Sequence, residues 1–261
     1  MDTLSWPRYF RSVWISDTHL GTRTCQAKAL RSFLSSLRCE QLYLVGDIID
    51  LWQLKKNWYW DADHDGCVQT VLRMAQNGTH VVYVPGNHDE FARGYCGSGI
   101  FRIIEMAEHA FHETADGRRL LVIHGDEFDG VVKYARWLAF LGDTSYQFAL
   151  SANRWFNLFR RTFGYPYWSL SAYLKRMVKN AVSFISNFEH ALAAEAKRRG
   201  ADGVVCGHIH HAEIKTIDGV TYCNSGDWVE SLTALVEHPD GTLEVLRYAE
   251  LQRVPALALA S

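Results

Sequence analysis

The sequence predicts an α/β protein built around a layered core. Short apolar, β-branched runs bounded by Gly, Asp or Pro alternate with segments of helical period, and such alternation indicates a sheet covered on both faces. After residue 207 the pattern changes to alternating runs separated by turn dipeptides, which is typical of hairpins. With 261 residues, 48% of them apolar, the chain can fill one large domain or a domain with a sizeable insertion.

The elements follow in order along the chain. Five short buried strands are predicted at residues 12–16, 41–45, 80–85, 118–123 and 203–206. Helices are predicted at residues 26–37 and about 64–77, the second ended by Gly78. The dipeptides Asp218-Gly219 and Asp240-Gly241 mark hairpin turns. These assignments describe an α/β core closed by a carboxyl-terminal antiparallel set.

Composition excludes several classes of function. The formal net charge of −2 gives the whole molecule no general attraction for nucleic acid. Six cysteines without a CxxC pair favour a reducing compartment over disulfides. The first ten residues lack the apolar core of a signal peptide, and no apolar stretch approaches the roughly 20 residues that span a bilayer. We therefore expect a cytoplasmic protein that binds no nucleic acid.

Residues 131–190 differ from the rest of the chain. They hold fifteen aromatic residues and eight Lys or Arg against two acidic residues, so the segment carries +6 and the remainder −8. The spacing is helical, which predicts a single domain over 1–261 with a helical insertion, or lid, at 131–190. One interpretation is a surface for an anionic amphiphile. The alternative is a helical pair whose aromatics form a core and whose cations are solvated.

Five polar motifs stand where predicted strands end. They are Asp17-Thr18-His19, Gly46-Asp47, Gly86-Asn87-His88-Asp89, His124-Gly125-Asp126 and Gly207-His208-Ile209-His210. Ligands gather at the carboxyl ends of strands in open α/β sheets, because the loops there converge. We therefore expect these side chains to meet in one cleft.

The residue types in these motifs are those of a pair of divalent metal ions. Asp47 is the best candidate for a carboxylate that touches both metals, and Asn87 offers a neutral oxygen. Asp17 with His19, and His208 with His210, stand two residues apart and can serve the same or neighbouring ions. The set mixes oxygen and nitrogen ligands without a thiolate, so Mn, Fe, Mg and Zn all fit.

In this order the five motifs resemble those of the calcineurin-like metallophosphoesterases, over residues 13–228. The resemblance implies an αββα sandwich of two sheets with a dinuclear site. One metal would be held by Asp17, His19, Asp47 and His210. The other would be held by Asp47, Asn87, His124 and His208. His88, supported by Asp89, would remain as the catalytic histidine that assists the departing oxygen, while a water shared by the metals attacks phosphorus. A purely structural His88 is the alternative.

Within that superfamily the chain is most similar to the UDP-2,3-diacylglucosamine pyrophosphatases of lipid A biosynthesis. The similar features are Leu20-Gly21, the run at residues 43–52, and a helical insertion after the His124 motif. The similarity implies hydrolysis of the substrate to 2,3-diacylglucosamine 1-phosphate (lipid X) and UMP, with peripheral contact to the anionic inner membrane. Typical members carry Arg where this chain has His88. That departure favours a second hypothesis, in which the substrate is another nucleotide diphosphate, phosphodiester or phospholipid; a non-catalytic scaffold is a third.

Three cations are candidates for substrate binding. Arg93 could reach a phosphate from the edge of the site, or it could be a solvated surface residue. Lys175 and Lys179, one helical turn apart in the insertion, could meet a diphosphate or a headgroup, or form a solvated face. An aromatic cluster at Trp52 and residues 58–60 is open to core packing or to a hydrophobic rim.

Overall fold

The computed structural model describes residues 8–98, 103–131, 163 and 170–251. The chain divides into two compact units, one formed by Met1–Asp126 with Leu192–Ser261 and the other by Glu127–Ala191. Both sheets and all five polar motifs lie in the first unit. Much of the segment at 131–190 falls outside the described residues, so its role as an insertion stays a prediction. Among the described residues, no helix is both long and apolar enough to cross a membrane.

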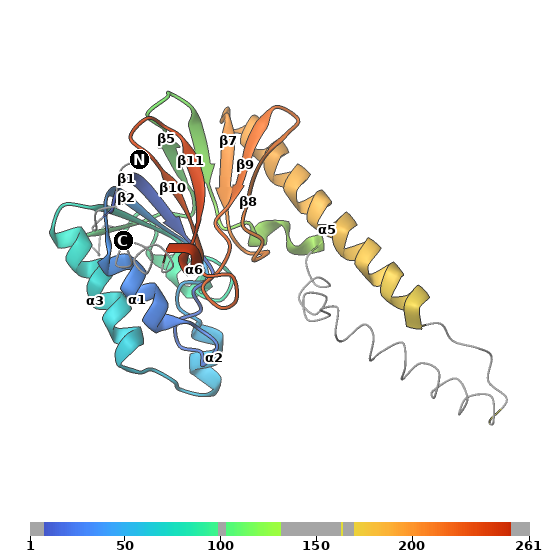
Figure 1. Cartoon of the computed structure of the whole chain (residues 1–261), viewed down its shortest axis with the longest axis horizontal. Coiled ribbons are helices and arrows are strands. Elements are labelled where there is room, and N and C mark those ends of the chain that lie inside the picture. Colours follow the sequence, from blue (N-terminus) through green and yellow to red (C-terminus); the bar gives the residue numbers. More distant parts are fainter. Residues whose placement is uncertain (1–7, 99–102, 132–162, 164–169, 252–261) are drawn as a thin grey trace, which may run out of the picture. The chain divides into compact units, whose positions relative to one another are not determined.

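The first sheet has six strands in the order β11-β10-β1-β2-β3-β4. Its strands are β1 (Arg8–Ile15), β2 (Leu37–Val45), β3 (His80–Val84), β4 (Ile104–Met106), β10 (Thr233–Glu237) and β11 (Leu243–Arg247). Figure 1 labels four of them, β1, β2, β10 and β11. Strands β1 to β4 are parallel, whereas β10 pairs antiparallel with β1 and β11 antiparallel with β10. The carboxyl ends of β1, β2 and β3 therefore lie at one edge of the sheet.

The second sheet has five strands in the order β5-β6-β7-β9-β8. Its strands are β5 (Ala110–Glu113), β6 (Arg119–Val122), β7 (Gly203–Cys206), β8 (Glu213–Ile217) and β9 (Val220–Asn224). The two predicted hairpin turns are both present, but the carboxyl-terminal strands do not form one antiparallel group as predicted. β8 and β9 join the second sheet, while β10 and β11 join the first, because β10 extends the first sheet by pairing with β1.

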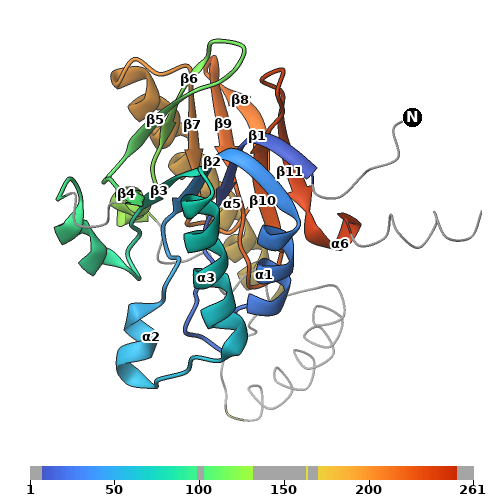
Figure 2. The ribbon, with the colours of Figure 1, turned by 90° about the vertical axis from the view of Figure 1, so that its left-hand side faces the viewer.

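The described residues form helices in both units, and two helices of the first unit flank the first sheet. The described helices are α1 (Ala27–Ser35), α2 (Leu51–Lys56), α3 (Ala62–Gln76), the 3-10 helices η1 (Glu90–Tyr95) and η2 (Asp126–Val131), α5 (Leu170–Arg198) and α6 (Tyr248–Leu251). Helices α1 and α3 pack side by side over one face of the first sheet (Figure 2). Leu30, Phe33 and Leu34 of α1 are buried there because the apolar positions recur at helical spacing.

Two apolar clusters of described residues lie between the layers. One lies between α1, α3 and the first sheet and includes Leu30, Val71 and Val13. The other lies between the two sheets, where Trp14 and Val84 of the first sheet meet Val122 and Val205 of the second. The predicted fold class is thus confirmed as a mixed α/β fold with two packed sheets and helices.

Candidate functional site

The five polar motifs all follow parallel strands, three in the first sheet and two in the second. β1 leads to Asp17 and His19, β2 to Asp47, β3 to Asn87 and His88, β6 to His124, and β7 to His208 and His210. Since β1, β2 and β3 are parallel neighbours and β6 and β7 are parallel neighbours, each sheet presents its motifs at one edge. The two sheets pack face to face, so both sets of loops contribute to a single site.

The backbone of these loops is unusual. Seven non-glycine residues in the described part of the chain have positive φ, and five of them belong to the motifs: Asp17, His19, Asp47, His208 and His210, with φ between 48° and 71°. The left-handed conformation costs about 1 kcal/mol or more for such residues. Its concentration at the strand ends turns consecutive side chains toward the site and is typical of a functional constraint.

Three glycines allow the loops to pack closely around the polar side chains. A Cβ added at Gly46 would lie 2.2 Å from the His124 ring, and one at Gly86 would lie 2.4 Å from Asp47 Oδ1. A Cβ at Gly207 would lie 2.4 Å from Asp17 Oδ2. These contacts are far below van der Waals distance, so each glycine is required by the neighbouring side chain of another loop.

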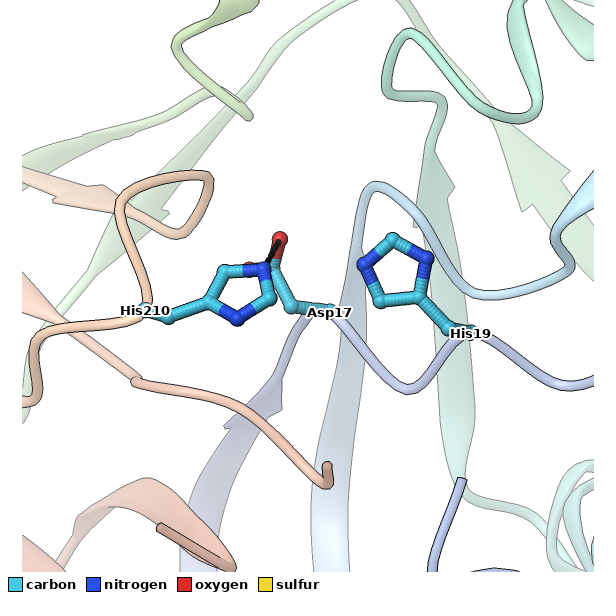
Figure 3. A group of neighbouring side chains, drawn as sticks. All are labelled: Asp17, His19 and His210. Atoms are coloured by element: carbon cyan, nitrogen blue, oxygen red, sulfur yellow. Dashed lines mark ion pairs between the residues drawn. The ribbon is translucent and has the colours of Figure 1, made fainter. Parts of the chain in front are cut away.

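Among the residues that the structure describes, three overlapping groups of side chains could each hold a metal ion. They are Asp17, His19 and His210; His19, Asp47 and His88; and Asp47, His124 and His208, each with candidate ligand atoms within 4.8 Å of one another. In Figure 3, His19 and His210 flank Asp17, and the dashed line joins His210 to the Asp17 carboxylate. Asp47 belongs to two groups, which is the arrangement expected of a carboxylate shared between two ions.

Contacts within the site orient these side chains. The His210 Nε2 atom lies 3.1 Å from Asp17 Oδ1, while the backbone amide of His208 donates to Asp17 Oδ2 at 2.8 Å. The Nδ1 atom of His124 lies 3.0 Å from the carbonyl oxygen of Val45, a contact that directs Nε2 toward the site. A histidine whose second nitrogen is held by a backbone carbonyl presents a fixed nitrogen to a metal.

Several buried polar atoms of the site have no hydrogen-bond partner. Among the described residues they include Asp47 Oδ2, His19 Nε2, Asn87 Oδ1 and His88 Nε2. Buried polar atoms are nearly always paired, so a concentration of unpaired ones requires an explanation. Divalent cations coordinated by oxygen and nitrogen atoms would satisfy three of these residues at once. The donor set therefore fits a metal centre.

The charges of the site support the same interpretation. Burial alone would raise the pKa of Asp17, but the facing His210 holds that pKa well below its ordinary value. Burial likewise opposes ionisation of Asp47, yet His124 lowers the pKa of Asp47 to about 2. Burial would lower the pKa of His124, whereas the Asp47 carboxylate raises it to about 10. Cationic partners are thus needed to keep two buried carboxylates ionised, and divalent ions would supply that charge.

Asp50 is a site residue that the sequence did not reveal. Its Oδ2 atom lies 3.1 Å from His19 Nδ1 and 2.9 Å from His88 Nδ1, although the second contact is too bent to count as a hydrogen bond. Its Oδ1 atom accepts the backbone amide of Gln53 and caps α2. One carboxylate therefore contacts two histidines of the site and accepts a hydrogen bond from His19. A signal was available, because Asp followed by an apolar residue and a short helical run is typical of an N-cap.

Asp89 contacts different groups from those expected. Its carboxylate accepts the backbone amides of Ile48 and Gly86 and the hydroxyl of Tyr83, and burial raises its pKa. The expected support of His88 by Asp89 is not found, because that carboxylate is engaged by backbone amides that link the β2 and β3 loops. Asp50 takes the place beside the His88 ring.

The three proposed substrate cations lie on two different helices. Arg93 lies in η1, where its Nη2 atom pairs with Asp126 Oδ2 at 2.6 Å, so it is tied to the His124 motif rather than freely solvated. Lys175 and Lys179 belong to helix α5, but their side chains lie outside the described residues. Trp52 is exposed and approaches the His88 ring, with ring centroids 4.4 Å apart.

The sequence profile of the calcineurin-like phosphoesterase family matches residues 10–212. This chain therefore belongs to the calcineurin-like phosphoesterases, and it is a metal-dependent hydrolase of phosphoesters that uses divalent cations. No curated protein sequence matches the chain significantly.

Three solved structures are similar to the chain at low identity. A single-substitution variant of Vps29 from Entamoeba histolytica shares 14% identity, with 90% of this chain and 97% of that chain covered and a TM-score of 0.44. A novel archaeal phosphodiesterase shares 13%, with coverages of 90% and 98% and a TM-score of 0.43. Phosphopantetheinyl hydrolase from Mycobacterium tuberculosis shares 15%, with coverages of 92% and 96% and a TM-score of 0.38.

Proposed function

We propose that this hydrolase holds two metal ions, with manganese favoured, and cleaves the pyrophosphate bond of UDP-2,3-diacylglucosamine to lipid X and UMP. The observation that carries the dinuclear assignment is the position of Asp47, whose two carboxylate oxygens face separate histidine groups. Oδ1 lies 3.5 Å from His124 Nε2, and Oδ2 lies 3.8 Å from His19 Nε2. These distances are too long for hydrogen bonds but suit two atoms that share a metal.

Each ion would draw its ligands from both sheets. The first is proposed to bind Asp17, His19, Asp47 and His210. The second is proposed to bind Asp47, Asn87, His124 and His208. Such a pair supplies an activated water and a positive clamp on the phosphoryl oxygens during an in-line displacement.

His88 is the proposed catalytic histidine. Its backbone amide donates to Asp47 Oδ1 at 2.8 Å, which fixes the loop, and its Nε2 atom is buried without a hydrogen-bond partner among the described residues. With Nδ1 beside the Asp50 carboxylate, His88 can carry a proton on Nε2 and deliver it to the departing phosphate oxygen. General acid assistance of this kind contributes roughly 10² to 10⁴ in rate.

The acylated substrate rests on the composition of residues 131–190. Fifteen aromatic side chains could bury acyl chains at about 0.8 kcal/mol per methylene, and the +6 charge suits phosphates or anionic headgroups of a membrane surface. Lys175 and Lys179 are the proposed cations for the substrate from this segment, and Arg93 is proposed from η1. Membrane contact of this kind would be peripheral, at a cytoplasmic surface.

A second candidate keeps the metals and changes the substrate. His88 stands where typical UDP-2,3-diacylglucosamine pyrophosphatases carry Arg, and that difference favours another nucleotide diphosphate, phosphodiester or phospholipid. The test is product analysis after incubation of the Mn-loaded protein with UDP-2,3-diacylglucosamine. Lipid X and UMP in equal amounts support the proposal, whereas hydrolysis of simple diesters without these products supports the second candidate.

Shortening the segment at 131–190 gives a second test. A folded, metal-loaded deletion variant should show a steeply raised Michaelis constant for UDP-2,3-diacylglucosamine but little change for bis-p-nitrophenyl phosphate. It should also bind anionic vesicles more weakly, most visibly at low salt, where the cations are least screened. Equal losses on both substrates would count against a lipid-binding lid.

A further inference from the structure

A pocket opens beside His88 that the proposed metal ligands do not use. It has a volume of about 340 Å³, and α2 and η1 supply its walls. Trp52 and Lys55 come from α2, and Phe91 and Arg93 from η1, with Glu90 at the start of η1. The volume lies in the range of small-molecule sites. A group held in this pocket would therefore be adjacent to the proposed catalytic histidine.

The pocket presents two aromatic faces to solvent. Trp52 is 41% exposed and Phe91 is 65% exposed, although large aromatic residues are usually well buried. The Trp52 ring is tilted by 34° to the His88 ring, at a centroid distance of 4.4 Å. Exposed aromatic rings at the edge of a polar site are suited to stacking against a planar ligand.

The same walls carry cations. Lys55 follows Trp52 by three residues in α2, so both side chains occupy one face of that helix. Lys55 is exposed, and no carboxylate pairs with it in the described part of the chain. Arg93 stands on the opposite wall, held by Asp126. Cationic and aromatic side chains in one small pocket match a ligand that is both planar and anionic.

Helix α2 is fixed relative to His88. The backbone amide of Leu51 donates to the His88 carbonyl at 3.2 Å, and Asp50 both caps α2 and contacts the His88 ring. None of the residues of α2 is buried, so this helix does not fill the core. Because α2 is held firmly and its side chains are not buried, we infer that its role is to form one wall of the pocket.

We propose that this pocket binds the nucleoside monophosphate half of the substrate, with its base against Trp52 and Phe91 and its phosphate near Lys55. The assignment of this half to a cleaved substrate rests on the proposed function, but nucleotide binding can be measured independently. An acyl chain fits less well, because Lys55, Glu90 and Arg93 place charged groups in the same walls.

The test measures competitive inhibition of bis-p-nitrophenyl phosphate hydrolysis by the full-length, metal-loaded protein. UMP and inorganic phosphate are the two inhibitors, and the ratio of their inhibition constants isolates the nucleoside. We expect UMP to bind more tightly than phosphate in the wild type. Phe91→Ala and Trp52→Ala should each raise the inhibition constant of UMP at least about fivefold relative to that of phosphate. This factor corresponds to the lower end of the binding free energy lost with one base–aromatic stack.

Two control variants change residues near the pocket that do not line it. Trp58→Ala removes an aromatic residue of greater exposure, and Lys56→Ala removes the cation next to Lys55; neither side chain lines the pocket. Both should leave the inhibition ratio unchanged. The proposal is overturned if UMP binds no more tightly than phosphate, or if Phe91→Ala and Trp52→Ala leave the ratio unaltered.

The outcome for the proposed function is separate. Weaker inhibition by UMP in the Phe91 and Trp52 variants, combined with no hydrolysis of UDP-2,3-diacylglucosamine, would support the nucleotide pocket and reject the proposed substrate. Release of lipid X and UMP, combined with unaltered inhibition ratios, would keep the substrate and reject the pocket. The Phe91 and Trp52 variants could also weaken inhibition by lipid X and leave inhibition by UMP unchanged. That result would assign the pocket to the acylated sugar and overturn the proposal.

Discussion

Two buried groups of histidines and carboxylates in this molecule have opposite characters. Between the sheets, His112 and Glu237 are both fully buried, and His112 Nε2 lies 2.7 Å from Glu237 Oε2. The other ring nitrogen of His112 lies 3.1 Å from the Tyr43 hydroxyl, and Arg11 Nη1 lies 2.8 Å from Glu237 Oε1. This group satisfies its own polar atoms.

Around Asp47, at the strand ends, the spacing is wider. Asp47 lies 3.5 Å from His124, 3.8 Å from His19 and 3.9 Å from His88, and its Oδ2 atom has no hydrogen-bond partner among the described residues. Ligand atoms of one metal, each about 2.1 Å from it, lie roughly 3 to 4 Å apart. The comparison teaches that the distances around the central carboxylate, rather than residue type or burial, distinguish the Asp47 group from the structural pair of His112 and Glu237.

Among these variants, the largest effect on activity is expected for substitution of Asp47. Asp47→Ala should abolish hydrolysis and remove more bound metal than His19→Ala, because Asp47 is proposed to touch both ions. Elemental analysis and activity assays of the purified variants check this expectation. Full occupancy by two metals in Asp47→Ala would reject the bridging assignment.

Substitution of His88 should separate binding from chemistry. His88→Ala is expected to keep both metals while lowering turnover by roughly 10² to 10⁴, the range for lost acid or electrostatic assistance. Metal content and turnover number on the identified substrate are the measurements. Near-normal turnover would mean that His88 has a structural role, as His112 has between the sheets.

Asp50 tests whether a carboxylate that contacts two histidines matters as much as the ligands themselves. Asp50→Asn should lower metal affinity or turnover by about 10- to 100-fold, as is typical when a partner of a metal-bound histidine is changed. The control is Asp61→Asn, since Asp61 caps α3 and contacts His64 without reaching the site. If both variants lost the same activity, helix capping alone would account for the effect.

The smallest effect on activity is expected between the sheets. Glu237→Gln should cost roughly 2 kcal/mol of unfolding free energy, by weakening charge-assisted hydrogen bonds, and leave hydrolysis within about twofold of wild type. Urea titration and an activity assay measure the two quantities. A large loss of activity with unchanged stability would contradict the division between the two groups.

The stability difference between wild type and Glu237→Gln should also depend on pH. Burial would raise the pKa of Glu237, but its hydrogen bond with His112 lowers that pKa from 4.5 to about 2. Because the pKa is depressed on folding, the stabilisation is complete above about pH 4.5 and is lost as the pH falls toward 2. The difference in unfolding free energy between wild type and Glu237→Gln should therefore shrink over that interval. A difference independent of pH would mean that the glutamate is not ionised in the folded protein.

The sequence predicted the strand ends better than the strand beginnings. The predicted strand at 41–45 ends at Val45 as expected, but β2 begins at Leu37, inside the predicted helix 26–37. Leu37 pairs with Arg8 of β1, and this pairing overrides the local helical pattern. The short strands β4 and β5 were not predicted, because three or four residues carry too little periodicity to be recognised.

The candidate ligands could be found because each stands shortly after a strand end, and four of them, Asp47, Asn87, His124 and His208, adjoin a glycine. Asp50 could not be recognised in the same way, because its effect depends on contacts with His19 and His88 from two other loops. Asp89 shows the converse limit. Its adjacency to His88 in sequence suggested a partnership, but neighbouring residues in a turn point in different directions, and its carboxylate accepts amides from the β2 and β3 loops.

The origin of the candidate ligands in both sheets has a consequence for the lifetime of the folded protein. Asp17 and His19 follow a strand of the first sheet and His210 follows one of the second, so a bound ion would fasten one sheet to the other. Ions that bind only the folded state add about 2.7 kcal/mol of stability at a hundred times their dissociation constant. Chelation should thus shorten the survival of the protein during heating and protease treatment, and storage with manganese should prolong it.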